Sequence, residues 1–193
     1  MEKTLILVAA PPACGKTYCA KKLAAGLSGA AYFDKDDLAP MVAQIFAAAG
    51  QEADMDGGFY AAAIRDAEYE TVLQLALSAL EFSDCAVINA PFGWQLAHPG
   101  YFEKLKRALS EKRIRLVFVW VQADEQTCRK RMEERAAERD RKKIRDWESY
   151  RRSLRFVPPA FLAEEKLVDR FFVIDNRDEL SCEASVAAIL KEI

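Results

Sequence analysis

The stretch that decides the fold is Ala10-Pro-Pro-Ala-Cys-Gly-Lys-Thr17, which follows the apolar segment Thr4–Ala9 and precedes a helix-forming run. A buried strand that leads through small residues into Gly-Lys-Thr is typical of a phosphate-binding loop. Backbone N–H groups at the start of the helix would surround the phosphates, Lys16 would add a positive charge, and Thr17 would ligate Mg²⁺. Ala10 stands where the pattern G-x-x-x-x-G-K-[ST] has its first glycine. We interpret residues 10–17, hereafter the phosphate loop, as a stiffened variant that binds a nucleotide triphosphate such as ATP.

The composition is that of a single globular domain. The chain has 193 residues, and 51% of them are hydrophobic, which is enough for a sizeable core. No apolar run is long enough to span a bilayer, and the N-terminal segment lacks the features of a signal peptide. Five cysteines without paired spacing argue against a disulfide framework and a zinc site. We therefore expect one domain over residues 1–193, located in the reducing cytoplasm and not in a membrane.

Positive charge is concentrated in one segment of a chain whose net charge is −2. Residues 129–155 hold 12 basic and 6 acidic residues, whereas the remainder holds 16 basic and 24 acidic residues. This asymmetry predicts an anionic ligand handled at one place, and it argues against nucleic acid as a partner. The alternative is a solvated helix with ion pairs between residues four apart, and charge alone leaves both readings open.

Short apolar segments alternate with helical patterns along the chain. This alternation predicts a three-layer α/β domain with a parallel sheet, in which ligands bind beyond the carboxyl ends of the strands. The stretch Gln51–Gly58 is expected to be a loop. The expected strands are Thr4–Ala9, Ala30–Phe33, Ala86–Asn89, Ile114–Val121 and Phe171–Ile174. The expected helices are Thr17–Leu27, Leu38–Ala49, Phe59–Phe82, Gly100–Lys112, Glu125–Arg152 and Glu179–Lys191.

Polar residues follow the second and third expected strands. Among Asp34, Asp36 and Asp37, one carboxylate would activate or position an acceptor hydroxyl, and another would hold the metal. We favour Asp36 as the base and Asp34 for the metal, although Asp36 or Asp37 could instead cap the next helix. Asn89 ends the third strand where many phosphate-loop proteins carry an acid, and its amide brings no charge. Either Asp34 or Asp36 compensates for this, or metal binding is weak.

The loop after the third strand is aromatic, and it holds Phe92, Trp94, His98 and Tyr101. It would line an acceptor pocket or form a hydrophobic cover over the sheet. His98 is the only histidine, and we assign it no role. After the last strand, Asn176 and its neighbour Arg177 are candidates for contacts with adenine.

Three arginines recur at a spacing of four residues: Arg131, Arg135 and Arg139. This spacing predicts that they lie along one face of a helix. The planar guanidinium group can bind phosphate oxygens in a bidentate manner or stack on a purine. Such a helix could close over ATP as a lid. Alternatively, the arginines form salt bridges with Glu134 and Glu138.

Four segments together carry a family resemblance: APPACGKT, FDKDDL, VINAPF and RMEERAAERDRKK. The chain resembles the small-molecule kinase branch of the P-loop NTPases, in particular the AAA_33-type group with chloramphenicol phosphotransferase, zeta-toxin-like kinases and polynucleotide kinase domains. The resemblance covers nearly the whole chain, and the phosphate loop is its specific part. It implies a five-stranded parallel sheet in the order 2-3-1-4-5, with lid helices at about residues 125–155. It also implies Asp36 as the base, and Arg131, Arg135 and more weakly Arg139 as lid arginines.

The favoured hypothesis is a kinase that moves the γ-phosphate of ATP to a hydroxyl group of a small molecule, with Mg²⁺ as cofactor. Lys16 and Asp36 would be catalytic, and Arg131 and Arg135 would stabilise the transition state. A nucleotide-sugar kinase and a non-catalytic ATP-binding module are the alternatives, whereas the acidic remainder of the chain disfavours a polynucleotide kinase. The sequence leaves the acceptor and the oligomeric state open. The residues expected to contact the nucleotide are Ala13, Cys14, Gly15, Lys16, Thr17, Tyr18, Arg131, Arg135, Arg139 and Asn176, and those expected to contact the metal are Thr17 and Asp34.

Overall fold

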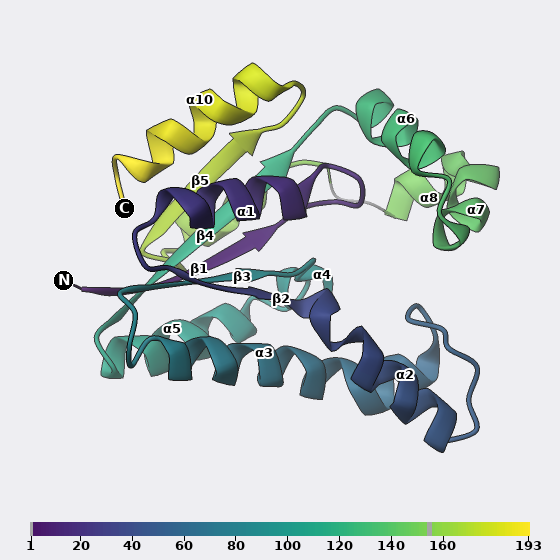
Figure 1. Cartoon of the computed structure of the whole chain (residues 1–193), viewed down its shortest axis with the longest axis horizontal. Helices are drawn as coiled ribbons and strands as arrows, with labels where there is room; N and C mark the ends of the chain where they lie inside the picture. Colours follow the sequence, from purple (N-terminus) through teal and green to yellow (C-terminus); the bar gives the residue numbers. More distant parts are fainter. Residues whose placement is uncertain (1, 154–155) are drawn as a thin grey trace.

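A sheet of five parallel strands forms the middle of the molecule, in the order β2-β3-β1-β4-β5 (Figure 1). The computed structural model describes residues 2–153 and 156–193, except for the side chains of residues 138, 139, 142 and 153. Each strand begins and ends within one residue of its expected bounds, so the predicted sheet is confirmed. The strands are β1 (Lys3–Ala9), β2 (Ala31–Asp34), β3 (Cys85–Asn89), β4 (Ile114–Gln122) and β5 (Arg170–Asp175).

Helices cover both faces of the sheet, and β1 is buried on both sides. Its alternate side chains point to opposite faces: Leu5 and Leu7 belong to one hydrophobic cluster, and Ile6 and Val8 belong to the other. This is why the strand reads as a continuous apolar run and not as an alternating one. The first cluster contains residues of α3 (Arg65–Ala79) and α5 (Gly100–Glu111), and the second contains residues of α1 (Lys16–Gly26) and α10 (Glu179–Leu190). Figure 1 shows these two helix pairs on opposite sides of the sheet.

The segment proposed as a lid, for which we keep the name lid, differs from the expected single helix over Glu125–Arg152. It consists of α6 (Glu125–Arg135), α7 (Glu138–Arg145) and α8 (Trp147–Ser153). The first break falls at Ala136, whose φ of 48° is left-handed and whose N–H bonds to the Met132 carbonyl at 3.2 Å. The residue that ends α6 in the left-handed conformation is an alanine and not the usual glycine. The sequence therefore contained no signal that the helix would end there.

The prediction that Arg131, Arg135 and Arg139 share one helix face is therefore wrong. Arg131 and Arg135 lie in α6, which ends at Arg135, and Arg139 belongs to α7. The side chain of Arg139 lies outside the described part of the chain.

Two more expected helices begin with a different local geometry. A 3₁₀ turn, η1 (Lys35–Leu38), precedes α2 (Ala39–Ala48), and a π-helical turn, η2 (Tyr60–Ile64), precedes α3. Two short helices were not anticipated from the sequence, α4 (Gly93–Leu96) and α9 (Phe161–Glu164). In the portion of the chain that the structure describes, no helix has both the length and the apolar character needed to cross a membrane.

Candidate functional site

The phosphate loop connects β1 to α1, and its conformation depends on two residues with positive φ. Ala13 has φ of 63°, and Gly15 has φ of 82° and directly precedes α1. Ala10, which replaces the first glycine of the pattern, does not adopt a positive φ and is buried in the core. Alanine is therefore accommodated there without backbone strain. Among the described residues no side chain caps the start of α1, so its first N–H groups remain available to phosphate oxygens.

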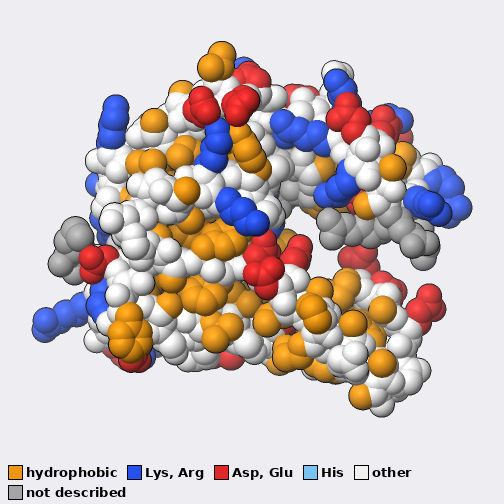
Figure 2. Space-filling model, viewed as in Figure 1, with side chains coloured by type: hydrophobic (Ala, Val, Ile, Leu, Met, Phe, Trp, Pro, Cys, Tyr) orange, Lys and Arg blue, Asp and Glu red, His pale blue; other side chains and the backbone are white. Residues whose placement is uncertain are grey.

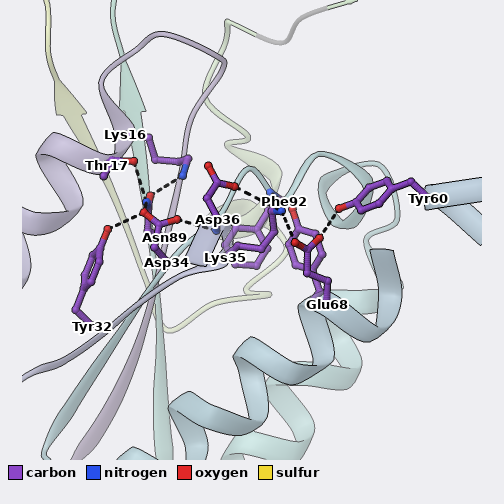
Figure 3. Close-up of polar contacts among 11 residues, drawn as sticks. Lys16, Thr17, Tyr32, Asp34, Lys35, Asp36, Tyr60, Glu68, Asn89 and Phe92 are labelled. Atoms are coloured by element: carbon purple, nitrogen blue, oxygen red, sulfur yellow. Dashed lines mark hydrogen bonds and ion pairs between the residues drawn. The ribbon is translucent and has the colours of Figure 1, made fainter. Parts of the chain in front are cut away.

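Asn89 links the phosphate loop to the end of β2 (Figure 3). It is fully buried, and it lies between Val8 and Asp34 because both are its register partners in the sheet. Its Oδ1 accepts a hydrogen bond from Lys16 Nζ at 2.6 Å. Its Nδ2 donates to Thr17 Oγ1 at 3.0 Å and to Asp34 Oδ2 at 2.6 Å. One uncharged amide thus brings a cation, a hydroxyl group and a carboxylate together, as the sequence predicted for Lys16, Thr17 and Asp34.

The environment of Lys16 makes its charge responsive to ligands. Burial lowers the pKa of Lys16 to about 8, while Asp34 and Asp36 act in the opposite direction. An anion placed beside Nζ would favour the charged form and raise that pKa.

The carboxylates after β2 have distinct surroundings. Asp34 caps η1 by accepting the Asp36 N–H at Oδ1, at 3.0 Å, and it also accepts the Tyr32 hydroxyl at Oδ2, at 3.2 Å. Asp36 has a side chain that is 62% exposed, and its Oδ1 lies 3.6 Å from Lys35 Nζ. Asp37 is exposed. Asp34, and neither of the other two, therefore provides the helix cap, which leaves the Asp36 carboxylate open to solvent.

Thr17 and Asp34 are suitable ligands for Mg²⁺. Both supply hard oxygen atoms, and both bond to the same Asn89 amide nitrogen. Within the described residues, no group of three or more His, Cys, Asp or Glu side chains could hold a metal ion. Mg²⁺ typically binds one or two protein oxygens and completes its shell with phosphate and water. The donors present fit an ion that is shared with a nucleotide.

Two arginines of α6 have different partners. Arg131 Nη2 donates to the Asn176 carbonyl at 3.0 Å, and its Nη1 is buried without a hydrogen-bond partner among the described residues. Arg135 donates from Nε and Nη2 to Asp140 Oδ2, at 2.9 and 2.6 Å. The predicted alternative, salt bridges along the lid, is thus realised for Arg135 with a different acid. Arg131 instead lies against the phosphate loop.

Asn176 supports the phosphate loop directly. It is 4% exposed, and its Nδ2 donates to the Cys14 carbonyl at 2.7 Å, while its N–H bonds to Gln122 of β4. Cys14 is buried, and its Sγ lies 3.1 Å from Cys128 Sγ. Tyr18 is 43% exposed, and its hydroxyl donates to Glu179 at 3.0 Å.

The aromatic loop divides into a buried part and an exposed part. Phe92 is buried and packs on Phe118, with ring centroids 6.3 Å apart, which makes it part of the core. Trp94 is 38% exposed, stacks on His98 at 4.0 Å and receives Arg65 over its ring at 4.9 Å. The covering role is therefore confirmed for Phe92, and a contact of Trp94 with an acceptor stays a prediction.

Sequence reasoning missed the buried acid Glu68, which is 1% exposed and bonds to Lys35 and Tyr60. A signal was present, because Glu68 interrupts a stripe of buried residues at a spacing of four, Ile64, Val72 and Ala76. A single acid on such an apolar face is a sign of a buried partner. Figure 2 shows the space next to this region as a hollow between the lid and α2, with acidic side chains at its inner end.

Comparisons with solved structures give the same fold. A candidate kinase from Chloroflexus aurantiacus is 16% identical with a TM-score of 0.64, over 99% of this chain and 96% of that one. Kti12 of Chaetomium thermophilum, in complex with ADP-AlF3, is 17% identical with a TM-score of 0.58, over 97% of each chain. Shikimate kinase of Bacteroides thetaiotaomicron is 15% identical with a TM-score of 0.54, over 98% of this chain and 97% of that one.

At the level of sequence, a search of curated proteins finds no match. A family profile, however, matches residues 5–158 of this chain, and its description is "AAA domain". That segment contains the phosphate loop, the η1 carboxylates, Asn89 and α6. The protein therefore belongs to the AAA_33 family, within the P-loop NTPases.

Proposed function

We propose that this protein is a kinase that transfers the γ-phosphate of ATP to a hydroxyl group of a small molecule. The observation that carries the proposal is the Asn89 amide, which joins Lys16 and Thr17 of the phosphate loop to Asp34. Asp36 follows Asp34 by two residues and has an exposed carboxylate. A triphosphate held by the loop would have its terminal phosphate beside these groups. We place the reaction in the cytoplasm, in keeping with the five cysteines, which are all free.

On the donor side, the residues of the phosphate loop would bind and orient the nucleotide. The N–H groups at the start of α1 would bind phosphate oxygens, and Lys16 would exchange its bond to Asn89 for a bond to phosphate. Thr17 and Asp34 would hold Mg²⁺, which when bound neutralises charge on the β- and γ-phosphates. Arg131 would contribute a further positive charge from the lid side of the loop.

On the acceptor side, Asp36 would accept the proton of the attacking hydroxyl group. As that oxygen forms a bond to the γ-phosphorus, the bond from this phosphorus to the β–γ bridging oxygen breaks and ADP leaves. Arg135 would stabilise the charge on the transferred group after it exchanges its Asp140 partner for phosphate. The hollow between α2 and the lid is where the acceptor would bind (Figure 2).

The test is a transfer assay with ATP labelled at the γ-phosphate, Mg²⁺ and a panel of neutral sugars, sugar acids, aromatic alcohols and a nucleotide sugar. We expect a labelled product with at least one compound. Lys16→Ala should abolish nucleotide binding or turnover. Asp36→Asn should retain ATP affinity and lose transfer, whereas the matched variant Asp37→Asn should retain both. An active Asp36→Asn enzyme would rule out the role of this carboxylate.

A non-catalytic ATP-binding module is the second candidate, and the uncharged Asn89 in the strand end favours it. In that case calorimetry would detect ATP binding, while no compound of the panel would be labelled. Labelling of the nucleotide sugar alone would instead identify a nucleotide-sugar kinase.

A further inference from the structure

A cluster of buried polar side chains lies behind Asp36 (Figure 3). Lys35, Glu68 and Tyr60 are 5%, 1% and 9% exposed. Lys35 Nζ donates to Glu68 Oε1 at 2.9 Å, and the Tyr60 hydroxyl donates to Glu68 Oε2 at 2.5 Å. Because Lys35 Nζ also lies 3.6 Å from Asp36 Oδ1, it connects a carboxylate of the interior to the exposed carboxylate.

Three elements meet at this cluster. Lys35 belongs to η1, Glu68 to α3 and Tyr60 to η2, the π-helical turn. Turns of this kind are uncommon and occur frequently at functional sites. Tyr60 also packs in a small cluster with Val42 and Phe46, which belong to α2. The cluster therefore attaches the turn that carries Asp36 to α2 and α3.

Packing alone does not account for these charges. An apolar residue at position 68 would complete the stripe formed by Ile64, Val72 and Ala76. Replacing a buried ion pair by apolar side chains of similar volume is often neutral or stabilising, because each charge loses hydration on burial. If only a stable core were needed here, Lys35 and Glu68 would bring no advantage.

We propose that Glu68 and Lys35, supported by Tyr60, are positioning residues that fix the direction of the Asp36 carboxylate toward the acceptor. The inference rests on the proposed function, because it takes Asp36 as the base. The backbone of Asp36 is held by the bond from its N–H to Asp34 Oδ1. The side chain is held at Oδ1 by Lys35, so the other oxygen can be presented to a hydroxyl group. Glu68 keeps Lys35 in place and is itself fixed by Tyr60.

The decisive variant is Lys35→Met/Glu68→Leu, which replaces the pair by apolar side chains of similar size. The protein should remain folded, because the loss of two buried charges offsets the cost of leaving the Tyr60 hydroxyl group without a partner. For the acceptor found with the panel, kcat should fall by roughly 100-fold, the size expected when a reacting group is misplaced by about 1 Å, while KM for ATP stays within about twofold. The matched control is Lys22→Met/Glu183→Leu, which removes an exposed pair of 2.7 Å between α1 and α10. Its transfer rate should equal that of the unmodified protein.

Hydrogen exchange supplies a readout that needs no acceptor. In the double variant the amides of residues 35–38 should exchange about tenfold faster, while those of β1 are unchanged. Unchanged exchange in η1, or transfer at the original rate by a folded double variant, would overturn the inference. If the double variant does not fold, Tyr60→Phe decides: a lower kcat at unchanged KM for ATP supports the inference, and an unchanged kcat contradicts it. If the unmodified protein transfers no phosphate, the proposed function is contradicted. The hydrogen-exchange measurement would still test whether Lys35 and Glu68 fix the position of Asp36.

Discussion

Gly15 is held in a left-handed conformation directly against Asn176. A Cβ atom built on Gly15 would lie 2.1 Å from Asn176 Nδ2, the atom that bonds to the Cys14 carbonyl. Two separate requirements therefore exclude a side chain at position 15, the positive φ and the close approach.

Gly15→Ala should lower the melting temperature and weaken ATP binding by at least about tenfold, because Asn176 must move and release the loop. The control is Gly29→Ala, where φ is 66° but no atom lies within 4 Å of the added Cβ. It should lose only about 1 kcal/mol from the backbone conformation and keep its ATP affinity. Calorimetry and thermal unfolding of both variants provide the check, and equal ATP affinities would contradict the prediction.

The pKa of Lys16 predicts how nucleotide binding depends on pH. Burial lowers this pKa to about 8, so the free protein carries the charge below pH 8 and loses it above. Because bound phosphate raises the pKa, affinity should fall by up to about tenfold per pH unit above pH 8, with proton uptake on binding. Between pH 8 and the ordinary pKa of 10.5, the folded chain binds fewer protons than the unfolded chain, so this group's contribution to stability rises with pH.

Calorimetry with ADP in the absence of Mg²⁺, in two buffers of different ionisation enthalpy, would measure both effects on Lys16. Lys16→Met should bind weakly and without this pH dependence. A slope shared by both proteins would show that another group is responsible.

At the scale of elements, the junction between α6 and α7 depends on one buried acid. Asp140 has a side chain that is 3% exposed, and it accepts two bonds from Arg135. This pair joins the end of α6 to α7 across the left-handed Ala136. The lid is thus a set of short helices with a defined joint, and not a rigid rod.

Asp140→Ala should loosen this joint and leave the sheet intact. We expect the amides of residues 136–145 to exchange about tenfold faster, because the Arg135 side chain no longer bridges the two helices. Glu133→Ala, which removes the exposed pair with Arg129, should have little effect, since exposed ion pairs stabilise by less than about 1 kcal/mol. Faster exchange throughout β1 and β4 would contradict a local role.

At the scale of the whole molecule, the two faces of the sheet bury different kinds of side chain. The hydrophobic cluster on the α1 and α10 side of the sheet contains four buried cysteines, in the pairs Cys14 with Cys128 and Cys19 with Cys182. Cys85, at the start of β3, is half-buried. A hydrogen bond from Cys128 lowers the pKa of Cys14, but Cys14 is fully buried all the same.

Treatment of the folded protein with N-ethylmaleimide should therefore modify Cys85 first, although burial raises its pKa. Intact mass should show one adduct well before any other, and all five cysteines should react in denaturant. Cys85→Ser should abolish the early adduct. Early modification of Cys14 would show that the phosphate loop opens readily.

Much of this arrangement could be predicted from the sequence. The strands are short apolar runs buried on both faces, and their bounds follow from that local pattern. Lys16, Thr17 and Asp34 lie together because parallel strands end at the same edge of the sheet, and their roles toward nucleotide and metal stay predictions. The break at Ala136 was not predicted, because alanine has high helix propensity and the bond between Arg135 and Asp140 that spans the turn is a tertiary contact.

The sequence by itself determined the order of elements and the phosphate loop, because hydrophobic periodicity and the Gly-Lys-Thr motif are local properties of the chain. Only the tertiary structure decided which polar groups are partners. Asn89 lies beside Lys16 and Asp34 because β3 pairs between β1 and β2, and Lys35 meets Glu68 across 33 residues of chain. Buried polar groups must find partners wherever the fold brings them together, and that choice is not written in any local pattern.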